Sequence, residues 1–305
     1  MIPTARQLFL EVNPRLGRKT DASRDLLEKK FFCSLRLSNG VYKKTWAGRF
    51  EDVHQILTAE FQRLGVAPKS FLDVAVSSGA STIEWLESLQ EAGLRPSMTA
   101  TDLTMNVYLL RLHRWIHVLV DKEGFPLQYD VCGLAWRPRC RIRFYLLGNG
   151  LLTILWRMLY WAAARRCDLT RRLKSLHGNP PSIDDSVIKA QIKLVTYRVR
   201  DNKDIELLDD DITAPTPPSL RSRFEVIRAA NILHRSYFST QQLREAVRNL
   251  RDRLVGPGAF LLIVRTETGT ESNHGSLFCL DDNGSFEVRA RIGRGSELED
   301  LVLSI

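Results

Sequence analysis

Residues 71–103 limit the folds open to this chain more than any other segment. An apolar run, FLDVAV, leads into the small-residue loop SSGAS, which is followed by a helix-like stretch and a second apolar run ending in TATDL. A strand, loop, helix and strand in this order are typical of a nucleotide-type ligand site at the carboxyl edge of a parallel sheet. Gly79, which has no side chain, allows the backbone to approach a ligand closely. We therefore predict an α/β fold with a ligand site at this loop.

The same segment indicates which ligands fit. The loop lacks the first and middle glycines of the GxGxxG pattern, and no P-loop lysine follows it. A site for a pyrophosphate is therefore disfavoured. Asp102 ends the second strand, where a carboxylate accepts hydrogen bonds from both hydroxyls of a ribose. The pattern favours a ligand that contains a ribose but no pyrophosphate.

Composition places the chain among ordinary globular proteins. It has 305 residues, of which 44% are hydrophobic and 26% charged, enough for a large core in one or two domains. The cysteines form no CxxC pair, so a disulfide framework or a zinc site is disfavoured. The N-terminus lacks the apolar core of a signal peptide. These features predict a cytoplasmic protein. The five cysteines are Cys33, Cys132, Cys140, Cys167 and Cys279.

Periodicity divides the chain into a helical start and an α/β remainder. Residues 1–69 carry apolar residues at three- and four-residue spacing, which predicts helices. From residue 70 onward, strand-like and helix-like stretches alternate, and the tail HGSLFCLDDNGSFEVRARI reads as a hairpin. We predict an N-terminal helical region, 1–69, and a domain, 70–305, built on a parallel sheet closed by an antiparallel hairpin.

An insertion at about 113–185 interrupts this alternation. It begins with a predicted hairpin, IHVLVDKEGFPLQYDV, and continues into an apolar stretch, 144–164, that predicts a helix. About 20 apolar residues are enough to span a bilayer. However, Asn149, Thr153 and Arg157 recur every four residues and would form one polar stripe, and arginines flank both ends. A helix in the membrane interface is favoured; a buried lid and a true span stay open. Residues 186–199 predict a further helix.

Positive charge is concentrated around this apolar stretch. The whole chain carries +9, but residues 131–200 alone hold fourteen Lys and Arg against three acids. The charge frames an apolar helix rather than an exposed aromatic platform, so an anionic membrane surface is favoured over nucleic acid. We predict that residues 137–174 bind this surface and that the protein lies peripherally on the inner face of the membrane. Alternatively, several arginines pair with acids elsewhere in the molecule.

The order of five motifs resembles a class I S-adenosylmethionine-dependent methyltransferase. The motifs are DVAVSSGAS, TATDL, DDDIT, FEVIRAANILHRSYF and VGPGAFLLIVRT. The resemblance covers residues from about 70 to the C-terminus, apart from the insertion. The second half is most similar to chemotaxis-receptor (CheR-like) glutamate methyltransferases, through Asn231, Tyr237 and Phe238. It implies a Rossmann-like methyltransferase sheet and S-adenosylmethionine as cofactor.

The resemblance also implies roles for individual residues. The first loop would support the methionine part of the cofactor, Asp102 and Leu103 would bind at the ribose, and Asn231 would lie beside the cofactor, facing the substrate pocket. Asp211 would contact the adenine amine while Ile212 packs on the ring. The pattern departs from the family where Ala230 replaces an arginine and where two loop glycines are missing. The loop residues are Asp73, Ala75, Ser77, Ser78 and Gly79.

Methyl transfer needs an in-line approach and, for an amine or hydroxyl acceptor, removal of a proton. His234 is the best-placed candidate base, and Tyr237 is a candidate to orient the acceptor. The acids Asp209 to Asp211 end a strand, and we predict no metal there. The sequence thus predicts a methyltransferase acting on a hydrophobic or membrane-tethered acceptor. A catalytically inactive scaffold of the same fold and an RNA methyltransferase stay open as alternatives.

Overall fold

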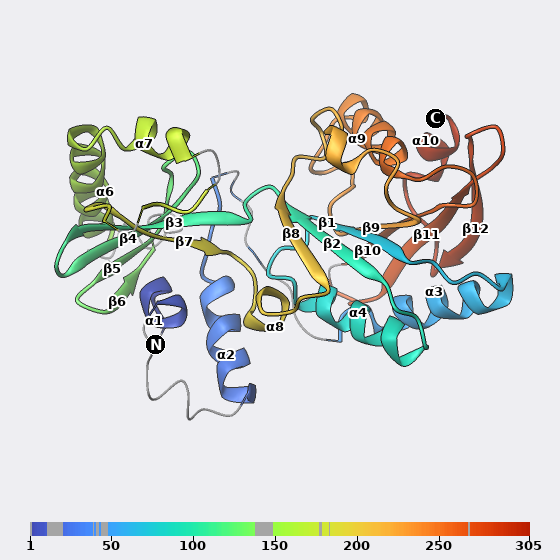
Figure 1. The fold of residues 1–305 in the computed structure, drawn as a ribbon, viewed down its shortest axis with the longest axis horizontal. Helices are drawn as coiled ribbons and strands as arrows, with labels where there is room; N and C mark the ends of the chain where they lie inside the picture. The colour runs from blue at the N-terminus through green and yellow to red at the C-terminus, as the bar shows by residue number, and fades with distance from the viewer. Residues whose placement is uncertain are drawn as a thin grey trace. The chain divides into compact units, whose positions relative to one another are not determined.

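The computed structural model describes residues 2–10, 21–38, 40, 43, 48–137, 149–176, 179–182, 184–267 and 269–305. The chain forms two compact units. One contains Met1–Lys44 and Thr104–Thr196, and the other contains Thr45–Leu103 and Tyr197–Ile305. The predicted boundary at residue 69 does not coincide with these units, since α1 and α2 belong to the first and α3 to the second (Figure 1). The two parts of the second unit are joined along the chain by Thr104–Thr196, which belongs to the first unit.

The second unit is built on a seven-stranded sheet in the order β12-β11-β10-β9-β1-β2-β8. Five neighbouring strands are parallel, and the last two form an antiparallel hairpin at one edge. The predicted α/β fold with a parallel sheet and a C-terminal hairpin is confirmed. The strands are β1 (Ser70–Val74), β2 (Ser97–Asp102), β8 (Ile205–Asp209), β9 (Val226–Ala230), β10 (Phe260–Thr266), β11 (Asn273–Leu280) and β12 (Phe286–Ile292).

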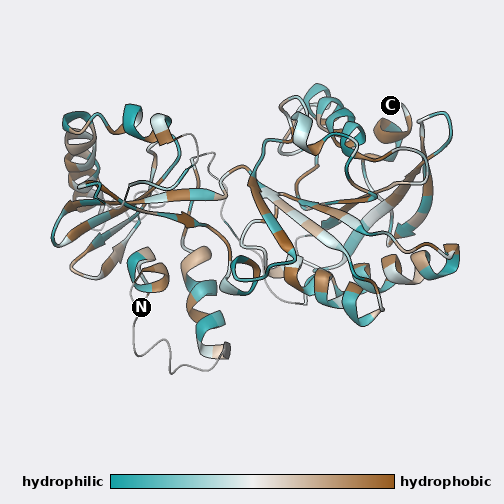
Figure 2. Cartoon of the chain, viewed as in Figure 1, coloured by the Kyte–Doolittle hydropathy of each residue, from teal (hydrophilic) through white to brown (hydrophobic). Residues whose placement is uncertain are grey.

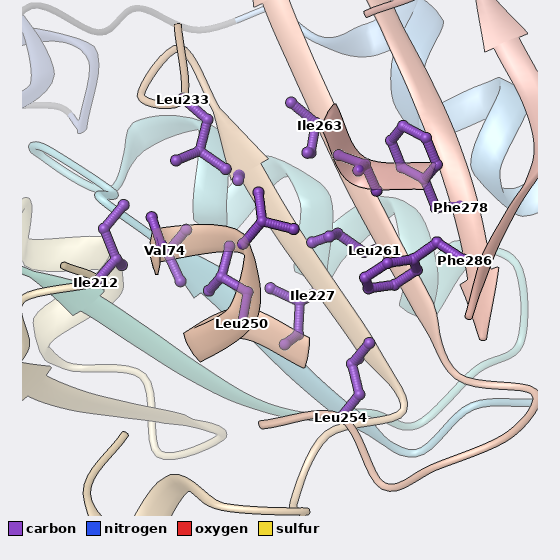
Figure 3. Close-up of a cluster of buried hydrophobic side chains, with 14 of the residues drawn as sticks. Val74, Ile212, Ile227, Leu233, Leu250, Leu254, Leu261, Ile263, Phe278 and Phe286 are labelled. Carbon is purple, nitrogen blue, oxygen red and sulfur yellow. The ribbon is translucent and has the colours of Figure 1, made fainter. Parts of the chain in front are cut away.

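Helices cover both faces of this sheet (Figure 1). α9 and α10 lie on one face, where alternate strand residues such as Leu72, Ile227 and Leu261 build an apolar core (Figure 3). Burial of such side chains is the main force that holds the layers together. The helices of this unit are α3 (Glu51–Leu64), α4 (Ala80–Glu91), α8 (Tyr197–Arg200), α9 (Thr240–Arg253), α10 (Glu299–Leu303) and the 3₁₀ turn η1 (Pro218–Leu220).

The opposite face, under α3 and α4, contains a buried ion pair. Arg228 of β9 donates from Nε to Asp73 Oδ1 at 2.9 Å and from its terminal nitrogen to Oδ2 at 2.5 Å. Thr82 also donates to this carboxylate at 2.7 Å, and the guanidinium lies 4.4 Å from the ring centroid of Trp85. Both charges are fully buried. An unpaired buried charge is strongly destabilising, so this core forms only when Arg228 and Asp73 pair with each other.

His54 of α3 completes the cluster as a neutral ring. Arg228 lies 2.7 Å from His54 Nε2, and arginine only donates, so this nitrogen accepts. Burial, followed by the charge of Arg228, lowers the pKa of His54 to about 2. The folded protein therefore keeps this ring unprotonated over the whole mildly acidic range.

This pKa predicts a pH dependence of stability. The unfolded chain binds a proton at His54 below pH 6.5, whereas the folded chain does not until about pH 2. The full stability is thus present above pH 6.5, and it falls below that value by about 1.4 kcal/mol per pH unit. In urea unfolding experiments at a series of pH values, we expect His54→Gln to remove this part of the slope. An unchanged slope in the variant would contradict a neutral His54.

The first unit is built on a five-stranded antiparallel sheet in the order β6-β5-β4-β3-β7. Alternate side chains of its strands are buried in two separate cores. One core also contains residues of α1 and α2, and the other contains residues of α6 and α7. On β3, for example, Val107 joins the first core and Tyr108 the second. The strands are β3 (Asn106–His113), β4 (Ile116–Asp121), β5 (Pro126–Val131), β6 (Leu134–Trp136) and β7 (Ile188–Lys193). The helices are α1 (Ala5–Phe9), α2 (Asp21–Phe32), α6 (Asn149–Arg166) and α7 (Leu169–Leu176).

The structure corrects part of the prediction for this region. The predicted hairpin is present as β4 and β5, but it belongs to a larger sheet that the sequence did not reveal. The predicted helix at 186–199 is wrong: Ile188–Lys193 is β7, paired with β3, and only Tyr197–Arg200 is helical. Period-two alternation of Ile188, Ala190 and Ile192 suits a strand once β3 offers a partner. The apolar helix is present as α6; residues 144–148 lie outside the described residues.

Candidate functional site

The loop after β1 has an unusual backbone. Ala75, Ser77 and Gly79 have φ values of 56°, 59° and 77°, in the left-handed region that residues with a Cβ rarely adopt. The Gly79 amide donates to the Val76 carbonyl at 2.9 Å as α4 begins. A Cβ on Gly79 would lie 2.9 Å from a methyl group of Val199. The loop therefore makes a tight turn between β1 and α4 that requires small residues.

Asp102 ties this loop to the end of β2. Its Oδ2 accepts a hydrogen bond of 2.8 Å from the Ser77 amide, and its side chain is 8% exposed. The next residue, Leu103, is exposed. The predicted loop and the predicted ribose-binding acid are in direct contact.

The contact lies at the point where the strand order reverses. Val74 of β1 pairs with Thr101 of β2 on one side and with Ala229 of β9 on the other. The chain runs outward from β1 to β2 and β8 in one direction and to β9 and β10 in the other. In open parallel sheets, ligands bind at the carboxyl edge where such a reversal occurs. Asp102, the loop and Asn231 all lie at this edge.

Asp73 differs from the other loop residues. It is 1% exposed, and both of its oxygens accept hydrogen bonds from Arg228 or Thr82. Its side chain therefore joins the structure under α3 and α4. Ser78, between Ser77 and Gly79, is also buried.

The three acids after β8 have separate surroundings. Asp210 accepts from Arg253 at 2.6 Å, which forms a second buried ion pair. Asp211 is exposed and accepts from the amide and hydroxyl of Thr213, at 2.9 and 2.6 Å, in a turn. Ile212 packs in the apolar core near Val74 (Figure 3). Asp211 and Ile212 were predicted to hold an adenine. In the structure, Asp211 instead bonds to Thr213, and Ile212 packs in the core.

Asn231 takes part in a hydrogen-bond network at the ends of β9, β10 and β11. Its backbone is left-handed, with φ of 57°, and its Oδ1 accepts from the Thr266 amide at 2.8 Å. The Thr266 hydroxyl donates to Asn273 at 2.8 Å and accepts from Arg49 at 2.9 Å. No motif pointed to Arg49, Thr266 or Asn273, because Arg49 lies more than 200 residues before the other two.

His234 and Tyr237 lie together after β9. Their ring centroids are 3.8 Å apart, and His234 Nδ1 is 2.6 Å from the Ser236 hydroxyl. Burial lowers the pKa of His234; Arg265 lowers it further and Glu297 raises it. The ring is therefore neutral at neutral pH, the state in which a histidine accepts a proton. Tyr237 is exposed.

Two hollows lie at the β10–β11 side of the sheet. One, of about 360 Å³, is lined by apolar residues that include Leu233 and Ile263 and by charged residues that include Arg265, Glu267 and Glu297. The other, of about 750 Å³, lies between the start of α3 and β11 and contains Arg49 and Asn273. Neither is lined by the β1 loop or by Asp102. Two residues that line the first hollow, Arg265 and Glu297, are also the charged groups that act on His234.

Within the described part of the chain, no three His, Cys, Asp or Glu side chains are grouped so that they could hold a metal ion. Among those same residues, no helix is both long and apolar enough to cross a membrane.

The turn at Gly79 allows a direct test. We expect Gly79→Ala to lower the free energy of unfolding by about 2 to 3 kcal/mol, because it adds left-handed strain and a contact with Val199. Gly93→Ala is the matched control: its φ is 83°, yet no atom lies within 4 Å of the added Cβ. The control should lose only the strain, about 1 to 2 kcal/mol. Urea unfolding measures both, and equal losses would show that the Val199 contact is unimportant.

No family model and no curated protein matches the chain. Among solved structures, it is similar to the N-methyltransferase NodS from Bradyrhizobium japonicum, in complex with S-adenosyl-L-homocysteine. The identity is 14%, the TM-score 0.32, and 74% of this chain and 66% of NodS are covered. It is also similar to SAM-bound CalS10, an amino pentose methyltransferase from Micromonospora echinaspora, with 12% identity, a TM-score of 0.34, and coverage of 86% and 82%.

A third similar structure is the CMeT domain of the citrinin polyketide synthase. The identity is 17%, the TM-score 0.32, and 69% of this chain is covered. The chain spans only 34% of the length of that structure. At these identities and TM-scores, the likenesses carry no argument about activity, substrate or partner.

Proposed function

We propose that this protein transfers a methyl group from S-adenosylmethionine to an acceptor molecule. The observation that carries the proposal is the bond between the Ser77 amide and Asp102 at the reversal of strand order. It places a tight small-residue loop and a strand-ending acid side by side, where a ribose-containing ligand binds in sheets of this kind. The motif order along the chain supports the same cofactor.

The residues present fit this cofactor at the loop and at Asp102. When bound, S-adenosylmethionine supplies an electrophilic methyl group. Asp102 would accept hydrogen bonds from the ribose hydroxyls, and the loop up to Gly79 would support the methionine part. The fit is poorer after β8, where Asp211 bonds to Thr213 and Ile212 is in the core.

His234 would serve as the base for an amine or hydroxyl acceptor. Its Nδ1 lies beside the Ser236 hydroxyl, which leaves Nε2 to receive the proton. A neutral ring is required for this step, and burial favours the neutral ring. Tyr237, in contact with the imidazole, would orient the acceptor.

The acceptor we propose is hydrophobic or associated with a membrane. The support is the group of exposed apolar side chains on α6. The predicted similarity to chemotaxis-receptor methyltransferases stays a prediction.

A catalytically inactive fold is the second candidate. The observations in its favour are that Asp102 is nearly buried, Asp73 is fully paired and Ile212 is in the core. Isothermal titration calorimetry with S-adenosylmethionine and S-adenosylhomocysteine tests both candidates. Binding of both ligands to the whole protein supports the site, and transfer of a labelled methyl group then separates an enzyme from an inactive fold. No binding of either ligand would end the proposal.

A further inference from the structure

Helix α6 has an apolar side that the described residues of its own unit leave exposed. Leu151, Ile154, Leu155, Met158 and Leu159 occur at the spacing that places residues on one side of a helix. Their exposed fractions range from 47% to 76%. We call these five residues the outer face of α6. Hydrophobic residues follow one another along most of this helix (Figure 2), and a contiguous exposed group of this kind marks an interaction surface.

The opposite side of α6 holds the helix on the antiparallel sheet. Tyr160 and Ala164 are buried in the core that contains Tyr108 and Tyr129, and the Tyr160 hydroxyl donates to the Gly124 carbonyl. Thr153 is buried as well, whereas Arg157 is exposed. Positions four apart lie on one side of a helix, so these two members of the predicted polar stripe share a side but differ in exposure. Since the inner side supplies the packing, the outer face is not needed for the fold of this unit.

Cations are frequent on α6 and α7, the segment that carries the outer face. Residues 149–176 contain a single acid, Asp168, which lies 4.0 Å from Arg171. Arg172 lies 3.8 Å from Asp185. These exposed ion pairs are long and contribute little attraction. The segment is therefore strongly positive. Its six cations are Arg157, Arg165, Arg166, Arg171, Arg172 and Lys174.

We propose that α6 docks on an anionic phospholipid surface, with its outer face among the acyl chains near the headgroups and its cations on the lipid phosphates. An apolar face on a segment rich in arginine matches this environment, because the apolar side chains suit the acyl chains and the cations suit the lipid phosphates. A second copy of the chain would bring the same positive charge to the interface, which opposes self-association through this face. A nucleic acid would leave the five apolar side chains without a partner. Docking in the interface needs no membrane-spanning helix.

The experiment is flotation of the whole protein with vesicles of phosphatidylcholine, with or without phosphatidylserine. We expect binding to the mixed vesicles and a marked weakening without phosphatidylserine or at high salt. The double substitution Leu155→Asp with Met158→Asp should weaken binding by more than about tenfold, because both side chains lose an apolar environment. Both residues are at least 50% exposed in the protein, so their replacement does not disturb the core.

A matched control is available on another helix of the same unit. Leu26 of α2 is 53% exposed, and Leu26→Asp should leave vesicle binding unchanged. Equal loss in the control and in the double variant would overturn the proposal, as would full binding by the double variant. Replacement of Arg165 and Arg166 by Glu should also weaken binding to phosphatidylserine vesicles, and no change would contradict the role of charge.

Two further outcomes count against the proposal. If the double variant changes the oligomeric state in sedimentation velocity and not vesicle binding, the outer face is a protein interface. RNA can be added as a competitor in the flotation assay. If RNA displaces the wild type from the vesicles and the double variant binds RNA and vesicles as well as the wild type does, the cations alone account for the binding. The assay contains no S-adenosylmethionine, so its failure and that of the proposed methyl transfer are independent.

Discussion

We expect Arg228→Met to lower the free energy of unfolding by about 3 to 5 kcal/mol. The substitution leaves the carboxylate of Asp73 buried with only Thr82 as a side-chain donor, and an uncompensated buried charge is among the costliest defects in a core. It also removes the contact of the guanidinium with Trp85. Urea unfolding followed by circular dichroism measures the loss. Whole domains have stabilities of about 5 to 15 kcal/mol, so this loss is a large share of the stability of the second unit.

The double variant Asp73→Asn with Arg228→Met provides the internal check. It removes both charges, so its loss should be clearly smaller than the sum of the two single losses. Arg223→Met is the matched surface control, since Arg223 and Glu206 are also close, at 2.6 Å, but about half exposed. It should cost less than about 1 kcal/mol. Additive losses in the double variant would mean that the two buried residues act separately.

The ion pair of Asp73 with Arg228 shows which part of the site could be predicted from the sequence. Asp73 precedes the loop, and its position in the motif predicted a ligand contact. The fold gives it another environment, because Asp73 pairs in register with Arg228, a residue 155 positions away. One signal for the pair did exist: each of two apolar strands carries a single charge, and the charges have opposite signs. A contact between them is the least costly way to bury both.

The parallel sheet was predictable because its signals are local. FLDVAV, SSGAS and TATDL each specify a strand, a turn or a strand end within a few residues, and their order specifies the sheet. The antiparallel sheet was not, apart from one hairpin. Its strands β3 and β7 are separated along the chain by α6 and α7, and the segment at 186–199 satisfies both helical and strand spacing. Pairing with β3 decides between them, and pairing is a tertiary effect.

The candidate site divides in the same way. The loop and Asp102 belong to two motifs whose strands are neighbours, so the sequence predicted that both lie at one ligand site; the bond from the Ser77 amide to Asp102 is a finding of the structure. The network of Asn231, Thr266 and Arg49 depends on side chains that meet only after α3, β9 and β10 are assembled. Ordinary polar residues of this kind carry no sequence signal of their own.

Asp102→Asn should weaken the binding of S-adenosylmethionine and S-adenosylhomocysteine by about ten- to a hundredfold. A hydrogen bond to a charged group contributes about 1.5 to 3 kcal/mol, and in the proposed site the carboxylate accepts from the ribose hydroxyls. Asn retains the shape of the side chain and one oxygen, which can still accept from the Ser77 amide. The loop is thus preserved while the charge is lost. Calorimetric titration of the variant with both ligands measures the change.

Asp204→Asn is the control for this experiment. Asp204 immediately precedes β8 at the opposite, amino edge of the same sheet, and its carbonyl accepts from the Met98 amide through the backbone alone. Its replacement removes one negative charge from the same unit and should leave the affinity unchanged. An equal loss in both variants would point to the overall charge of the unit, and wild-type affinity in Asp102→Asn would remove the ribose role. Loss in Asp102→Asn alone, with unchanged thermal unfolding, would locate the ligand at the carboxyl edge, because only there does the carboxylate meet both the loop and the reversal of strand order.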